Sequence, residues 1–196
     1  MNNLRERKKA DTREAIRSAA VELICAHGFD ATTMDAIAAA ADVSVRTVFR
    51  YFPTKEDLVF ADVDADLEDL RTLLDARPAD EPVMGSVRAV VEVLALRMDT
   101  GRDADVRLAP LLHDEPALRQ RYLGVLDQVE ETIADWARLR LGSGPGDLRP
   151  GLLAACMVSV QRVVTDAMVA GDPRPLADLI REAVALIGRG FDQLDA

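Results

Sequence analysis

The sequence has few of the residues that most often build disulfides, active sites and β-sheets. Its 196 residues include two cysteines and two histidines, and only 4% are aromatic. Cys25 and Cys156 lie far apart in apolar stretches with no second cysteine nearby, which favours two buried thiols over a disulfide or a redox switch. Because alanine and leucine are abundant and aromatic residues are scarce, we expect an all-α fold.

Motifs of the common catalytic and metal sites are missing from the sequence. It has no G-x-S-x-G, P-loop, H-E-x-x-H or G-x-G-x-x-G pattern. His113 stands beside Asp114 and Glu115, but one histidine with two acids indicates a solvated loop rather than a metal site. No apolar run reaches the ~18 residues that cross a membrane, and no apolar segment of a signal peptide follows the first residues. We therefore expect a cytoplasmic protein that is not an enzyme and needs no cofactor or metal.

The net charge of −10 is unevenly distributed along the chain. Residues 1–55 hold nine Lys or Arg and seven Asp or Glu, a net of +2, whereas residues 56–196 hold fifteen and twenty-seven, a net of −12. Arg5, Arg7, Lys8 and Lys9 form a run that is either a disordered arm reaching a DNA backbone or a solvated tail. A mildly basic N-terminal part before an acidic remainder suits a protein that presents only its first part to phosphates.

Residues 32–58 predict two short helices joined by a tight turn. The first helix has small apolar residues at helical spacing, at Ala36, Ile37, Ala40 and Val43. Ser44 offers a hydroxyl that caps the second. We expect the second helix to bury Val48 and Phe52 and to leave free Val45, Arg46, Thr47, Phe49 and Arg50. A short helix that presents arginine, threonine and aromatic groups suits insertion into a DNA major groove.

In order and spacing, this segment resembles the TetR family of bacterial transcriptional repressors. The matching residues are Gly28-Phe29, Thr32-Thr33, Ile37-Ala38, Val43-Ser44, Thr47, Tyr51-Phe52 and Lys55-Glu56-Asp57-Leu58. The sequence has Asp42 where the family usually has glycine, and Phe49 where it often has tyrosine. Asp42 tolerates the left-handed backbone that such a turn needs.

The resemblance implies which residues contact DNA. Backbone contacts are implied for Thr33, Thr47, Tyr51 and Lys55, and the Ser44 hydroxyl suits a phosphate oxygen as well. Base-facing or groove-facing positions are implied for Val45, Arg46, Phe49 and Arg50. An arginine can donate two hydrogen bonds to guanine O6 and N7. The alternative is a plain surface helix with two solvated arginines.

Along the rest of the chain the pattern is helical, and we expect about nine helices. The first begins near Asp11 with a D-x-x-E start signal and ends at Gly28. Thr54 caps a fourth helix that runs to about Ala76. We expect an N-terminal helix-turn-helix DNA-binding domain at residues 1–54 and a helical ligand-binding and dimerisation domain at residues 55–196.

The second domain, by resemblance, binds a small ligand and forms a homodimer. The last two helices, expected at 152–170 and 176–191, pair across a two-fold axis in the family. Their apolar stripes are Leu153, Cys156, Met157, Val160, Val164 and Met168, then Leu179, Ala183, Leu186 and Ile187. The stripes can equally be internal core, and one helix can serve both purposes.

Ligand-binding residues are weakly specified by the sequence. The candidates are Leu94, Met98, Tyr122, Leu126, Trp136 and Gln161, with Leu111 and Leu112 as further candidates. Trp136 has an alternative place in the core. A mostly apolar pocket favours a lipophilic or aromatic ligand.

The function predicted is a ligand-responsive transcriptional regulator, most simply a repressor, that binds a palindromic double-stranded DNA operator. Two other classes remain open: an all-helical protein–protein interaction module that works through its acidic part, and a small-molecule hydrolase or isomerase. The hydrolase or isomerase needs a clustered acid/base pair, and the sequence displays none. A mobility shift on DNA at low salt separates the interaction module from the regulator.

Overall fold

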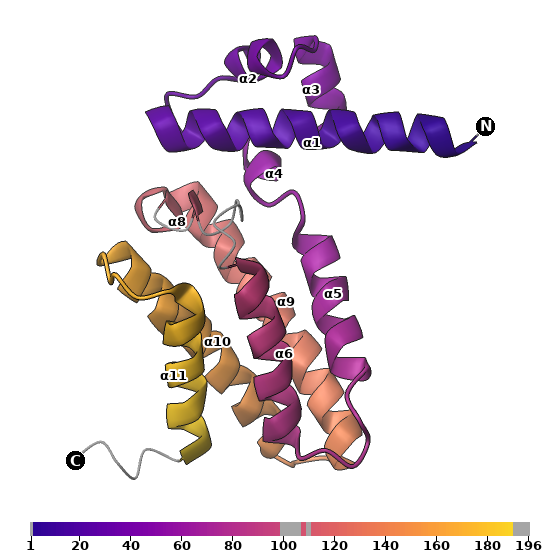
Figure 1. The fold of residues 1–196 in the computed structure, drawn as a ribbon, viewed down its shortest axis with the longest axis vertical. Helices are drawn as coiled ribbons and strands as arrows, with labels where there is room; N and C mark the ends of the chain where they lie inside the picture. The colour runs from indigo at the N-terminus through magenta and orange to yellow at the C-terminus, as the bar shows by residue number, and fades with distance from the viewer. Residues whose placement is uncertain (1, 99–106, 109–110, 190–196) are drawn as a thin grey trace. The chain divides into compact units, whose positions relative to one another are not determined.

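The structure, a computed structural model, describes residues 2–98, 107–108 and 111–189 of the chain. Within these ranges all regular structure is helical, as expected, and the number of helices is close to nine (Figure 1). The chain forms two compact units. We call the residues up to Asp62, with the described residues from 107 to 119, the head unit; the body unit holds 63–98 and 120–189. The domain boundary expected between residues 54 and 55 stays a proposal.

The head unit contains helices α1 (Asn2–His27), α2 (Met34–Ala40), α3 (Val45–Tyr51), α4 (Glu56–Val59) and α8 (Leu111–Asp114). These helices share one apolar core. Its most deeply buried side chains are Ile16, Ile24, Ile37, Val48, Phe52, Leu58, Leu108 and Leu118. Gly28 ends α1 with a φ of 88°, the left-handed conformation expected at that position.

Two sequence predictions about the head helices are wrong. Helix α1 begins at Asn2 rather than near Asp11, because residues 2–10 contain no glycine or proline and are mostly good helix formers. The basic run is therefore helical, not a disordered arm. In α2 the buried residues are Ile37 and Ala38, whereas Ala36 and Ala40 are exposed.

The fourth helix, expected to run unbroken to about Ala76, is divided into α4 and α5 (Val63–Asp75). Residues at the break are held by α1. The Asp62 carboxylate accepts from the Arg13 guanidinium at 3.0 Å and from that of Arg17 at 2.6 Å, and Arg13 also donates to the Ala61 carbonyl. Because these partners come from almost fifty residues away, helix propensity alone does not reveal the break. Thr54 does cap α4 as expected, through reciprocal hydrogen bonds with Asp57.

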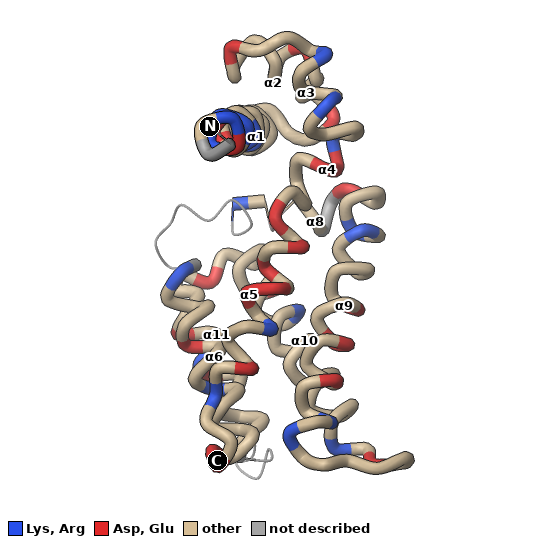
Figure 2. Tube along the Cα trace, turned by 90° about the vertical axis from the view of Figure 1, so that its right-hand side faces the viewer, with Lys and Arg blue, Asp and Glu red and all other residues tan. Residues whose placement is uncertain are grey.

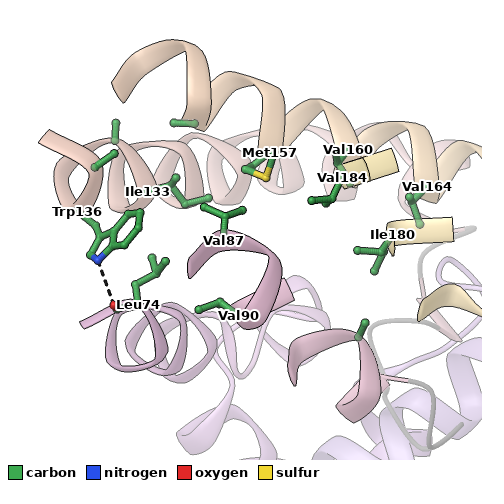
Figure 3. Close-up of a cluster of buried hydrophobic side chains, with 14 of the residues drawn as sticks. Leu74, Val87, Val90, Ile133, Trp136, Met157, Val160, Val164, Ile180 and Val184 are labelled. Carbon is green, nitrogen blue, oxygen red and sulfur yellow. Dashed lines mark hydrogen bonds between the residues drawn. The ribbon is translucent and has the colours of Figure 1, made fainter. Parts of the chain in front are cut away.

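The body unit contains α5, α6 (Val83–Met98), most of α9 (Pro116–Leu141), α10 (Arg149–Val169) and α11 (Leu176–Arg189). Helix α11 packs on both α6 and α10. Their shared core, which we call the body core, includes Leu74, Val87, Val90, Ile133, Trp136, Met157, Val160, Val164, Ile180 and Val184 (Figure 3). The Trp136 indole N–H donates to the Leu74 carbonyl at 3.1 Å and so ties α9 to the last turn of α5.

A polar cluster closes the loop between α5 and α6. Glu81 accepts from the guanidinium of Arg77 and from the Ser86 hydroxyl, and these hydrogen bonds, Arg77 first, lower its pKa to about 2. Arg140 of α9 donates to the carbonyls of Arg77, Pro78 and Glu81. The loop is thereby fastened to α9 by charge-assisted hydrogen bonds.

Of α9 and α10, the two longest helices with residues in the body unit, α10 is the more apolar. By length and composition alone it could cross a membrane, although a single such helix is weak evidence because core helices have the same character. One third of its most apolar 18-residue stretch is buried within the chain. One side of α10 thus packs into the body core and the other side is left uncovered.

Candidate DNA-binding site

The turn between α2 and α3 is defined by three local signals. The Thr33 hydroxyl oxygen caps α2 by accepting from Ala36 N at 3.2 Å. Asp42 adopts a φ of 54°, and Val43 N donates back to the Ala38 carbonyl at 3.0 Å, which closes the end of α2 in a Schellman arrangement. Ser44 caps α3 by accepting from Thr47 N at 3.1 Å. These bonds fix the direction in which α3 leaves α2.

Helix α3 has one buried side and one exposed side. Val48 is fully buried, and Phe52 at the C-cap is nearly so, as predicted. Arg46, Phe49 and Arg50 are exposed, and 48% of the Phe49 surface is accessible despite its apolar ring. Because they are three and four residues apart, these side chains share one helix face.

Three of the predicted DNA-contacting residues are less free than expected. Val45 and Tyr51 are partly buried against the head core. Thr47 is also partly buried, and its hydroxyl shares a 2.8 Å hydrogen bond with the Ser44 hydroxyl. The Arg50 guanidinium lies 5.1 Å from the centroid of the Tyr51 ring. The exposed face therefore consists of Arg46, Phe49 and Arg50, with the hydroxyls of Ser44 and Thr47 close to it in sequence, while Thr33 stands apart at the start of α2.

Lys55 follows the capping residue Thr54 at the start of α4, where we expected its ammonium to meet a phosphate. The structure gives that ammonium partners inside the protein. It donates to the carbonyls of Phe29 and Thr32, the latter at 3.0 Å, and it lies 4.2 Å from the centroid of the Phe29 ring. Lys55 thus joins the start of α4 to the loop between α1 and α2, and its contact with DNA stays a prediction.

Replacing Lys55 by methionine should lower the stability of the protein by about 1–3 kcal/mol, because two carbonyls lose a charged hydrogen-bond donor. Thermal unfolding measures this loss, with Lys8→Met as the control, since Lys8 is an exposed lysine without such partners among the described residues. An unchanged melting temperature would contradict the role of Lys55 in the head unit. A DNA affinity whose salt dependence falls by about one unit per protomer would show a phosphate contact as well.

Charge is distributed differently on the two units. Lys and Arg gather on the first turns of α1 and on α3, whereas acidic residues are frequent along the body helices (Figure 2). Between residues 2 and 50, every lysine and arginine lies on α1 or α3, and α2 has none. The cations on the first turns of α1 and on α3 therefore offer the local positive charge that a polyanion requires.

The predicted ligand-binding residues occupy several different environments, most of them in the body unit. Leu94 packs against the body core and Trp136 lies within it, which agrees with the core alternative for Trp136. Leu126 is buried and Gln161 is partly buried. The Met98 side chain lies outside the described part of the structure. Leu111 and Leu112 belong to the head unit, where they pack against its core.

Tyr122 differs from the other ligand candidates. Its hydroxyl oxygen has less than 1 Å² exposed and has no hydrogen-bond partner among the described residues. A groove of about 410 Å³ lies elsewhere, between α6 and α11, and Glu92 and Arg181 pair across it at 3.0 Å. No predicted ligand residue lines this groove. Among the described residues no group of three His, Cys, Asp or Glu side chains could hold a metal ion.

The uncovered side of α10 was not identified from the sequence. The stripe selected there, which includes Met157, Val160 and Val164, packs into the body core. The outer side instead exposes Leu152 and Val163, which are 61% and 62% accessible. They are eleven positions apart, just over three helical turns, so they lie on the same side. The sequence did contain a signal for this second side, because Leu152 and Val163 are apolar residues of α10 that lie outside the selected stripe.

Comparison with protein families gives two matches that together span most of the chain. Residues 16–61 match the family of bacterial regulatory proteins of the tetR type, and residues 81–192 match the MftR C-terminal domain. The HTH-type transcriptional regulator TcmR of Streptomyces glaucescens is 32% identical over 169 residues, which cover 83% of this chain and 75% of TcmR.

Solved structures of similar fold include two proteins named FadR. The Thermus thermophilus repressor, in complex with lauroyl-CoA, is 26% identical with a TM-score of 0.63, and the match covers 94% of this chain and 97% of that one. The fatty acid degradation regulator of Bacillus halodurans has a TM-score of 0.71 at 19% identity, covering 90% of this chain and 98% of that one. At 19% identity, the similarity to the Bacillus halodurans protein shows only that the two chains share a fold.

Proposed function

The chain belongs to the TetR family of bacterial regulatory proteins, and from that membership we propose that it represses genes by binding a palindromic operator as a homodimer. It is a DNA-binding transcriptional regulator rather than an enzyme. The observation that carries the proposal is the exposed face of Arg46, Phe49 and Arg50 on a helix that is capped and buried on its other side. A bacterial regulator that binds chromosomal DNA acts in the cytoplasm, so we propose a cytoplasmic location.

On the operator, we assign base contacts to the exposed face of α3. In helix-turn-helix proteins the recognition helix lies in the major groove, and its N-terminal residues contact base edges. Arg46 is in the first turn of α3, so it is the arginine best placed for a guanine, while the exposed Phe49 ring suits a thymine methyl. Arg50, held beside Tyr51 in the last turn, then suits the backbone at the groove edge.

For the dimer, the uncovered side of α10 supplies the contact, with α11 beside it. Leu152 and Val163 are large apolar side chains left exposed on the same side of α10, and contact with a second copy of the chain buries them. A two-fold axis brings the same side of α10 from each protomer together, as in most homodimers. Two recognition helices are then free to enter successive major grooves, about 34–36 Å apart along the DNA.

The effector site belongs to the body unit, and we place Tyr122 and Leu126 in it. A buried hydroxyl without a partner costs about 1–3 kcal/mol, and a polar atom of a ligand relieves that cost. Leu126 lies one turn along α9 from Tyr122 and is buried. The Thermus thermophilus FadR structure holds lauroyl-CoA, which makes an acyl-CoA a reasonable first probe for a lipophilic effector.

Release from DNA requires that the effector prefer one conformation of the body. Such a ligand shifts the population toward protein whose two recognition helices no longer match the operator spacing. The chain passes between the two units at Asp62, which Arg13 and Arg17 fasten to α1. We expect these ion pairs of Asp62 to couple a movement of α5 to α1 of the head unit.

Replacing Tyr122 by phenylalanine should leave folding and operator binding unchanged but weaken the response to effector. The change removes only a buried hydroxyl that has no partner in the described ranges of the chain, so thermal stability should stay the same or rise. The effector concentration that releases half of the operator should increase about 2- to 12-fold, the value of one hydrogen bond. An unaltered release curve would remove Tyr122 from the effector site.

A mobility shift with DNA from upstream of the gene tests the proposed function, with a salt titration and random competitor DNA. Retention that survives the competitor supports sequence-specific repression, and the retained DNA serves to screen lauroyl-CoA and related probes for release. Retention that competitor abolishes leaves only non-specific binding. No retention at low salt contradicts the proposal and favours an interaction module.

A further inference from the structure

The first turns of α1 carry four cations that neither the head core nor the face of α3 uses. Arg5, Arg7, Lys8 and Lys9 are all exposed, and none has an ion-pair partner among the residues that the structure describes. Helical geometry divides them between two sides of α1. At 3.6 residues per turn, Arg5, Lys9 and Arg13 follow one another along one stripe, which we call the basic stripe. Arg7 lies about 160° around the axis from both Arg5 and Lys9, whereas Lys8 lies about 100° from Lys9 and about 60° from Arg5, outside the stripe but near its edge.

The direction of the basic stripe is fixed by contacts farther along α1. The Arg13 guanidinium lies 5.4 Å from the centroid of the Phe52 ring, at the C-cap of α3. The next residues near the stripe, Ile16 and Ala20, are fully buried in the head core. The stripe therefore faces the side of α1 on which α3 ends. In Figure 1 the N-terminal turns of α1 run on past that end of α3.

The two sides of α1 also differ in the acids that accompany the cations. Asp11 and Glu14 lie four and seven residues after Arg7, on its side of the helix. Along the basic stripe, Asp62 pairs with Arg13, but the only acid of α1 beside Arg5 and Lys9 on that side is Glu6, at the edge of the stripe. Positive charge near a helix N-terminus is unfavourable, because the first backbone N–H groups are already the positive end of the helix dipole. An anion placed along the stripe removes this repulsion.

We propose that Arg5 and Lys9 bind phosphates of the operator outside the base pairs that α3 reads. The cations extend the positive surface from Arg50 on α3 past Phe52 and along α1, about 12 Å from Arg13 to Arg5 at 1.5 Å per residue. Contacts of this kind carry affinity and salt dependence but no sequence preference. The inference rests on the proposed operator binding and adds an outer pair of contacts to each half-site.

A pair of double variants with equal charge change tests the basic stripe. Arg5→Gln with Lys9→Gln removes the two stripe cations of the first turns and keeps Arg13, and Arg7→Gln with Lys8→Gln removes two cations that lie outside the stripe. Glutamine keeps a similar helix propensity, so both variants should fold alike, which thermal unfolding checks. The salt dependence of operator affinity and a hydroxyl-radical footprint are measured for both variants and for the wild type.

For the first variant we expect the slope of log affinity against log salt to fall by about 3.6 units, at 0.9 per phosphate for four contacts in a dimer. The outermost protected phosphates should also disappear from its footprint. The second variant should change the slope by about one unit at most and keep the footprint. Equal changes in both variants, or no change in the first, would overturn the proposal. A wild type that fails to bind operator would instead refute the proposed function.

Discussion

Replacing Val163 by glutamate should convert the dimer into a monomer and reduce operator affinity by about 10²- to 10⁴-fold. The magnitude follows from the geometry of a two-site complex. Once one half of a dimer is bound, the second half binds with an effective concentration that raises overall affinity by about that factor. A monomer keeps an intact α3 and binds a single half-site only. The loss arises without any change to a residue that contacts DNA.

The physical reason is the position of Val163 on the uncovered side of α10. It is 62% accessible in the single chain, so a carboxylate there stays hydrated and folding is little affected. In a two-fold dimer through this side, the glutamates of both protomers enter an apolar contact. Burial of an unpaired charge is strongly unfavourable, and two like charges near the axis add to the cost.

The control for this prediction is Leu139→Glu. Leu139 is an apolar residue of α9 that is 85% accessible, so the chemical change is matched but the helix is different. Sedimentation and a mobility shift should find this variant dimeric and bound to operator. If Val163→Glu also stays dimeric with full operator affinity, the interface does not include α10, and the proposed dimer is wrong.

The α2–α3 turn was predictable from the sequence because its determinants are local. Thr33 and Ser44 cap helices through hydrogen bonds to amides three residues away, and Asp42 occupies the left-handed backbone that closes α2. The positions of Val48 and Phe52 follow from the helical period. None of these features depends on residues far away in the sequence, so short-range patterns contain the information that determines them.

Features set by distant residues were missed, and Asp62 and Lys55 are examples. The break after α4 depends on Arg13 and Arg17, and the partners of the Lys55 ammonium are carbonyls more than twenty residues earlier. From the sequence, a lysine at the start of a helix predicts a phosphate contact. The structure adds that the Lys55 ammonium has carbonyl partners within the protein. Sequence spacing gives no account of which carbonyls the side chain reaches.

The ligand candidates were the least predictable part of the site. A pocket for a lipophilic effector uses the same apolar side chains as a core, and Trp136 shows the difficulty: its indole packs in the body core and donates to Leu74. A buried polar atom without a hydrogen-bond partner favours a pocket residue over a core residue, and it can be recognised only from the three-dimensional structure. Among the residues that the structure describes, the Tyr122 hydroxyl has this property, whereas the sequence shows only a tyrosine on a helix.

Replacing Arg46 by alanine should cost about 1–3 kcal/mol for each half-site and remove the preference for one base pair in it. A dimer uses the residue twice, so the total is about 2–6 kcal/mol, or roughly 30- to 25,000-fold in operator affinity. Arg46 is exposed in the first turn of α3, so the substitution should leave stability nearly unchanged. Binding to a library in which each operator position is varied measures the lost preference.

Arg50→Ala is the matched comparison, because it removes the same side chain one turn later. The Arg50 guanidinium lies beside the Tyr51 ring at the end of α3, which in the proposed complex is directed away from the bases. We expect this variant to weaken operator and random DNA by similar factors, since a phosphate contact carries no sequence information. The opposite pattern, with Arg46→Ala uniform and Arg50→Ala selective, would reverse the assignment of bases and backbone along α3. A uniform loss in both variants would mean that Phe49 and neighbouring apolar contacts, not the arginines, distinguish the operator from other DNA.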